Sequence, residues 1–107
     1  MATYQGADSW VALADGTRRA IVECLADGPL AVGELAHRLP VSRPAVSQHL
    51  KLLKSAGLVQ DRAVGTRRIY HLDPSGIEAL RADLDRFWVK ALSVYKRIVD
   101  ELEGDES

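Results

Sequence analysis

The sequence predicts a mainly α-helical domain with one small β-hairpin. Apolar residues recur at intervals of three and four over most of the chain, as on one face of a helix, and they alternate only between Leu58 and Leu72. The 107 residues suit one domain, which we therefore expect to span residues 1–107. The expected order is four helices, the hairpin and one long final helix.

Three short helices are expected first. Asp8 is the expected N-cap of the first helix and Thr17 that of the second, because a short polar side chain can accept a free N–H group of the first turn. A third helix is expected from Val32 to Leu39. It stops at Pro40, because proline has no N–H to continue the hydrogen-bond ladder.

The fourth helix has clear signals at both ends. Ser42 is the expected N-cap, and Pro44 lies in the first turn, where its missing N–H costs little. The helix is expected to run to Ala56, and Gly57 suits the position just after a helix, which often has a positive φ. A tight turn from Leu39 to Val41 joins this helix to the third.

A change of period marks the hairpin. Two short alternating segments, Leu58 to Ala63 and Arg67 to Leu72, flank a glycine-containing loop from Val64 to Thr66. Two helices joined by a tight turn and followed by a hairpin predict a winged helix-turn-helix. In a helix-turn-helix, the second helix enters the major groove of DNA.

The final helix is expected to begin with Asp73 as cap and Pro74 as first residue, and to end near Leu102 before a frayed tail, residues 103–107. Its apolar stripe covers about seven turns, more than a domain of this size can bury. We therefore expect residues 74–102 to form a dimerisation helix, assisted by the first helix. Packing within the chain is the alternative, and we expect it for the first part of the stripe. The expected dimer contacts are Trp10, Leu13, Leu84, Phe87, Trp88, Ala91, Leu92, Tyr95, Ile98, Val99 and Leu102.

Positive charge is concentrated in one third of the chain. The net charge of the whole sequence is only −1. Between Arg38 and His71, however, seven basic residues stand against one acid, Asp61, which gives this window +6 and leaves −7 for the remainder. Such a distribution predicts a surface that binds a polyanion such as DNA.

The polar face of the fourth helix suits the major groove. If Val46, Leu50 and Leu53 face the core, the opposite side carries small, polar and basic side chains. Glutamine can pair with adenine, serine can donate or accept, and alanine can contact the methyl group of thymine. The alternative to DNA binding is, for the helix, a polar face that is only solvated. For the arginines of the hairpin, the alternative is a charged strand edge that blocks strand addition. The expected DNA contacts are Ser42, Arg43, Ala45, Ser47, Gln48, Lys51 and Lys54 on the helix, and Arg62, Thr66, Arg67 and Arg68 on the hairpin.

These motifs resemble a known family. The segment from Leu13 to Leu72, above all SRPAVSQHLKLLKSAGLV and GTRRIYHL, is similar to the ArsR family of bacterial winged-helix transcriptional regulators, and most similar to non-metal members from actinobacteria. The resemblance implies a homodimer that binds operator DNA near its own or a neighbouring promoter, usually represses it and is released by an inducer. The residues that it implies at the bases are Arg43, Ala45, Ser47 and Gln48, and those along the backbone are Lys51, Thr66, Arg67 and Arg68.

The sequence predicts neither a metal site nor an active site. Metal-sensing members of the family carry paired cysteines in the third helix, or Asp and His in the last. Here the third helix, VGELAHRL, has no cysteine, and the last helix has Asp83 and Asp85 but no histidine. No catalytic triad and no glycine-rich phosphate cradle can be recognised either. We therefore expect no cofactor and no enzymatic activity.

The remaining features favour a cytoplasmic protein. No apolar run approaches the roughly 20 residues that span a bilayer, residues 1–8 do not resemble a signal peptide, and Cys24 is the single cysteine. Two other functions stay open. One is a winged helix that docks a protein partner with this same surface, and the other is a repressor that holds a small apolar ligand near Trp88 and Tyr95 at the dimer interface.

Overall fold

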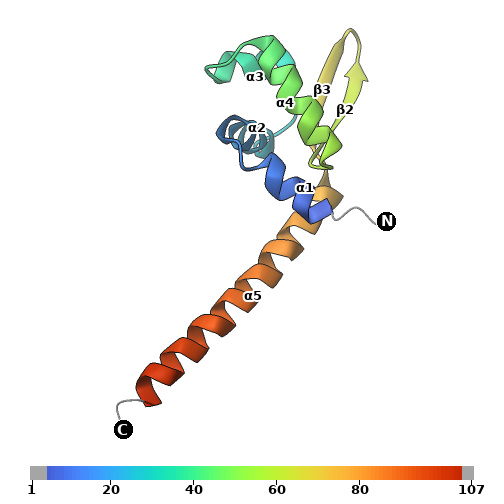
Figure 1. Ribbon diagram of the computed structural model, residues 1–107. Coiled ribbons are helices and arrows are strands. Elements are labelled where there is room, and N and C mark those ends of the chain that lie inside the picture. Colours follow the sequence, from blue (N-terminus) through green and yellow to red (C-terminus); the bar gives the residue numbers. More distant parts are fainter. Residues whose placement is uncertain (1–4, 105–107) are drawn as a thin grey trace.

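The computed structural model describes residues 5–104, and its elements are those of the predicted winged helix-turn-helix. Within that range five helices and three strands follow one another (Figure 1). They are α1 (Gln5–Ala12), α2 (Gly16–Ala26), β1 (Leu30–Ala31), α3 (Val32–Arg38), α4 (Arg43–Ser55), β2 (Val59–Val64), β3 (Arg67–Leu72) and α5 (Pro74–Gly104). None of these helices combines the length and the apolar composition that a membrane span needs.

The first two helices begin earlier than predicted. α1 already starts at Gln5, so Asp8 lies inside the helix and is not its cap. The N-cap of α2 is Asp15, whose backbone is extended and whose carboxylate accepts the N–H of Arg18 at 3.0 Å. The prediction of Thr17 as cap was wrong because an aspartate two residues earlier satisfies the same first turn.

The helix-turn-helix forms as predicted. α3 ends at Arg38 and α4 begins at Arg43, with Ser42 as its N-cap. The Ser42 hydroxyl accepts the N–H of Ala45 at 3.3 Å. After α4, Gly57 has a φ of +80°, the left-handed conformation that ends many helices and that glycine adopts without strain. Local capping therefore defines both ends of α4.

The sheet has one strand more than predicted. β2 and β3 are antiparallel and pair Val64 with Arg67, so the turn between them contains only Gly65 and Thr66. β1 pairs with the other edge of β3, which gives the order β1-β3-β2. The prediction missed β1 because two residues are too few to show an alternating pattern.

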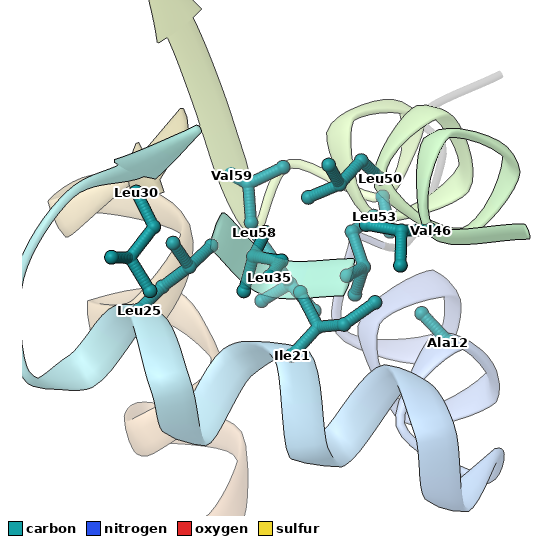
Figure 2. Close-up of a cluster of buried hydrophobic side chains, with 11 residues drawn as sticks. Ala12, Ile21, Leu25, Leu30, Leu35, Val46, Leu50, Leu53, Leu58 and Val59 are labelled. Carbon is teal, nitrogen blue, oxygen red and sulfur yellow. The ribbon is translucent and has the colours of Figure 1, made fainter. Parts of the chain in front are cut away.

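The core lies between the helices and the sheet and sets the orientation of α4. Figure 2 shows buried apolar side chains from α1, α2, α3, α4 and the strands β1 and β2 meeting in one cluster. Val46, Leu50 and Leu53 of α4 are fully buried in it, as predicted. Because one face of α4 packs on this cluster, the opposite face of the helix points to solvent.

A close backbone contact attaches α5 to the rest of the fold. The N–H of Asp73 donates to the carbonyl oxygen of Leu58 at 2.9 Å. A Cβ atom on Gly76 would lie 1.7 Å from the carbonyl oxygen of Gly57, so the first turn of α5 can approach this closely only with glycine at position 76. The direction in which α5 leaves the fold therefore depends on this junction.

α5 is a single helix of 31 residues that extends away from the other elements (Figure 1). The molecule is accordingly 71 Å long but only 34 Å and 22 Å across. The helix includes residues 103 and 104, which were predicted to fray, and the rest of that tail lies outside the described residues. We call residues 5–83 the head and residues 84–104 the arm.

Candidate nucleic-acid interface

The outward face of α4 carries the polar residues that were predicted to contact DNA. This face lies opposite the buried apolar row of the helix, and the sequence of α4 contains no carboxylate. Ser42, Arg43, Ser47, Gln48, Lys51 and Lys54 are exposed, and Ala45 is half-buried. The fold thus gathers the predicted helix residues on one accessible surface.

The hairpin of β2 and β3, which we call the wing, lies alongside α4 (Figure 1). The pairing of the strands places Arg67 and Arg68 just after the turn, where Arg68 faces Ala63 on β2. The turn lies near the start of α4, because Thr66 and Arg43 line the same hollow. Arg62, Thr66, Arg67 and Arg68 are all exposed. The wing therefore extends the basic surface beyond the helix.

One buried carboxylate ties the wing to α4. Asp61 on β2 accepts from Nζ of Lys54 and from Nη1 of Arg68, each at 2.7 Å, while its own side chain is only 6% exposed. These hydrogen bonds, first from Lys54 and then from Arg68, hold the pKa of Asp61 below its usual value. Because the two cations share one anion, the end of α4 and the wing are held in a defined relative position.

The sequence did not reveal this role of Asp61, which was noted only as the single acid between Arg38 and His71. The signal that could have found it is the pairing of the strands. Asp61 lies opposite Tyr70, so Arg68 is its diagonal neighbour on the same face of the hairpin.

A second carboxylate, on α3, pairs with the wing near its turn. Oε1 of Glu34 accepts from Nη2 of Arg67 at 2.7 Å and from the backbone N–H of Ala31 at 3.1 Å. The bond from Ala31, and next the positive charge of Arg67, lower the pKa of Glu34. Unlike Asp61, this carboxylate is well exposed, so water and ions can compete for its partner.

The ion pairs divide the predicted DNA-contacting cations into two groups. Lys54, Arg67 and Arg68 are paired with carboxylates of the protein itself. Arg43, Lys51 and Arg62 form no ion pair with any residue from 9 to 104. Across the same range, no three His, Cys, Asp or Glu side chains cluster closely enough to hold a metal ion.

A third contact holds α4 against the preceding helices. Nε of Arg18 on α2 donates to the carbonyl oxygen of Ala12 at 2.7 Å, and its Nη1 donates to Nδ1 of His49 at 3.4 Å. His49 is half-buried on α4, beside the core. One guanidinium thus joins the end of α1, the start of α2 and the middle of α4.

The arm exposes most of the apolar residues that were predicted to form a dimer. Trp10, Phe87, Trp88, Leu92, Tyr95, Ile98 and Leu102 are between 42% and 65% exposed, and Leu13, Leu84, Ala91 and Val99 are half-buried. The Trp10 ring lies edge-on to Phe87, with 6.2 Å between ring centroids, and links α1 to the start of the arm. Leu13 packs against the core of the head. Val89 and Val94, which the predicted stripe omitted, are also exposed.

Known proteins show the same sequence pattern. Residues 15–61 match the model of the bacterial regulatory protein, arsR family. The HTH-type transcriptional regulator Rv2034 of Mycobacterium tuberculosis is 68% identical over 100% of both chains. The transcriptional repressor SdpR of Bacillus subtilis is 33% identical over 63% of this chain and 74% of its own length.

A solved structure shows the same fold. It is the solution NMR structure of the homodimeric winged helix-turn-helix DNA-binding domain of Mb0332 from Mycobacterium bovis, a possible ArsR-family regulator. It matches with a TM-score of 0.67 and 34% sequence identity, over 82% of each chain. The family consists of transcriptional regulators and not of enzymes. The chain belongs to the ArsR family of bacterial DNA-binding transcriptional regulators.

Proposed function

We propose that the protein is a homodimeric transcriptional repressor that acts in the cytoplasm on a partly palindromic operator, including one at its own promoter. The observation that carries the proposal is the exposed polar face of α4 beside an exposed cationic wing. A helix-turn-helix with such a face inserts the helix into the major groove, and phosphate contacts fix its position. Repression follows because the bound dimer occludes RNA polymerase.

The proposed contacts divide by chemistry. The residues assigned to base edges are Arg43, Ala45, Ser47 and Gln48, whose side chains can donate, accept or contact a thymine methyl group. The residues assigned to the sugar–phosphate backbone are Ser42, Lys51, Lys54, Arg62, Thr66, Arg67 and Arg68. The first group gives sequence preference, and the second gives affinity that depends on salt.

The proposed dimer forms through residues 74–102 together with α1. The arm carries exposed apolar side chains at spacings of three and four, the pattern of helices that pack against one another. The relative Mb0332 is a homodimer in its solution structure, which supports the same assembly here. A two-fold dimer would place two copies of α4 about 34–36 Å apart, one turn of DNA.

A footprint of the purified protein on the DNA upstream of its own gene tests this function. We expect two protected half-sites with related sequences, and less transcript in a reconstituted transcription assay on the same template. Binding to the protected duplex should weaken steeply as salt rises, because each phosphate contact releases counterions.

Three outcomes would contradict parts of the proposal. Absence of salt-dependent duplex binding would favour a winged helix that docks a protein partner. A rise in transcript would make the protein an activator. A single protected half-site bound by one protomer would contradict the dimeric assembly.

A further inference from the structure

A hollow of about 260 Å³ lies between α3, the start of α4 and the turn of the wing. Three elements that are distant in sequence meet there, and each contributes to the wall. Its lining residues are Ala31, Val32, Gly33, Arg43, Thr66, Arg67 and Arg68. Three of the seven lining residues are arginines, and none carries a carboxylate, so the hollow suits an anion.

The arginines around this hollow differ in their partners. The guanidinium of Arg43 lies beside Gly33 of α3, since a Cβ at that position would meet its Cζ at 3.6 Å. Arg68 is held by Asp61, whose side chain is almost completely buried. Arg67 is held by Glu34, and both side chains of that pair are about half exposed, 59% for the arginine and 46% for the glutamate.

The burial of Asp61 makes its ion pairs harder to exchange than the pair of Glu34 and Arg67. Asp61 has two cationic partners and little access to solvent, so a competing anion gains little by displacing it. The pair of Glu34 and Arg67 is a surface salt bridge, which is worth little because water and salt screen it. A phosphate can offer an arginine a bidentate, charge-assisted contact that is stronger than a single exposed one.

We propose that the hollow holds one backbone phosphate of operator DNA, and that Glu34 is an internal competitor which Arg67 leaves when that phosphate binds. The inference rests on the proposed function, because it assumes that this face approaches DNA. In the free protein Glu34 holds Arg67 close to the position that it needs. The same carboxylate lowers affinity for DNA, because its ion pair must be broken.

The direct test is Glu34→Gln, which removes the charge but keeps an oxygen that can accept the N–H of Ala31, so α3 keeps its capping contact. We expect this variant to bind random duplex about two- to five-fold more tightly for each protomer, the range of one exposed ion pair. Glu23→Gln is the matched control, since it removes the same charge from an exposed position on α2. Glu23→Gln should leave the affinity for duplex nearly unchanged. The thermal unfolding temperature of Glu34→Gln should equal that of the wild type.

A double-mutant cycle separates competition for Arg67 from simple repulsion between Glu34 and DNA. In an Arg67→Ala background, Glu34→Gln should no longer increase affinity, because the residue that it releases is gone. A gain that persists without Arg67, or an equal gain in Glu23→Gln, would overturn the inference while leaving the proposed function intact. If the wild-type protein binds no duplex at all, both fail.

A salt exchange distinguishes DNA phosphate from free phosphate. Chloride is partly replaced by low millimolar inorganic phosphate at constant ionic strength, and duplex binding is compared between wild type and Glu34→Gln. The proposal expects equal binding in the two salts, and a selective loss for Glu34→Gln would also agree with it, because the free anion would then compete with DNA for the hollow. Phosphate that raises the thermal stability of Glu34→Gln while its duplex binding stays equal in the two salts would make the hollow a site for the free anion and would overturn the assignment to DNA.

Discussion

The head and the arm treat their apolar side chains in opposite ways. In the head, large aliphatic residues such as Ile21, Leu35 and Leu50 are fully buried by other parts of the same chain. In the arm, Trp88 is 57% exposed and Tyr95 is 65% exposed. Apolar residues at the same helical spacing are therefore buried in a core in the head but exposed on the surface in the arm. The head is stabilised within one protomer, and the exposed stripe is the reason why we propose that the arm packs against a second one.

Leucine truncations in the two regions provide the largest expected contrast. Leu50→Ala should lower the free energy of unfolding by about 2–5 kcal/mol, because it removes apolar contacts and leaves a cavity. Leu92→Ala, in the exposed stripe of the arm, should cost less than about 1 kcal/mol at low protomer concentration and more as concentration rises. Urea unfolding at two protomer concentrations measures both. If Leu92→Ala lowers the free energy of unfolding equally at both concentrations, the arm is not stabilised by a second protomer.

A charge placed on the arm tests the dimer directly. Tyr95→Glu puts a carboxylate in the middle of the apolar stripe and should yield monomers in sedimentation. Affinity for a site with two half-sites should fall on the order of 100-fold, because the second head is no longer tethered to the first. Ser93→Glu is the matched control, since it adds the same charge on the polar side of the same helix. Dimeric Tyr95→Glu would show that the stripe is not the interface.

Within the head, two substitutions separate sequence recognition from charge. Gln48→Ala should cost on the order of 1–3 kcal/mol on the operator and little on random duplex. Arg67→Ala should weaken both kinds of DNA alike and lower the salt slope by about one unit per lost phosphate contact, hence about two per dimer. Binding isotherms over a salt series distinguish the two. Wild-type binding by both variants would contradict the assignment of this face.

The head also shows which parts of a fold local sequence can predict. Ser42, Pro44 and Gly57 mark the ends of α4 correctly because caps act within one helical turn. β1 could not be predicted, since its two residues become a strand only by pairing with Ile69 and Tyr70 of β3. Asp15 and Thr17 were both able to cap α2, and the backbone conformation that decides between them is not visible in the sequence.

The sequence predicted which residues lie on the surface of the candidate site, but not the ion pairs that some of them form. The exposed polar face of α4 follows from helical periodicity, so its residues could be named from the sequence. The pairing of Glu34 with Arg67 joins residues 33 positions apart, and that of Asp61 with Lys54 depends on how the wing packs against α4. These ion pairs decide which cations are already paired within the protein, and they require the tertiary fold.

The smallest expected effect concerns the junction at the start of α5. The carboxylate of Asp73 accepts hydrogen bonds from the Gln60 side chain and from Ser75, and these lower its pKa to about 2. Because the folded pKa lies below the ordinary value of 3.8, the ionised carboxylate stabilises the folded state above about pH 4. That stabilisation is lost as pH falls from about 4 towards 2.

Asp73→Ala should therefore lower the free energy of unfolding by about 1 kcal/mol at pH 7, the usual cost of losing an N-cap. The difference from wild type should shrink towards zero near pH 2, where the wild-type carboxylate is itself being protonated. Urea unfolding at fixed protomer concentration across this pH range measures it, with Asp85→Ala on the exposed side of α5 as control. If the difference stays constant with pH, the charge of Asp73 does not hold the junction, and the start of α5 depends on the close contact between Gly57 and Gly76 instead.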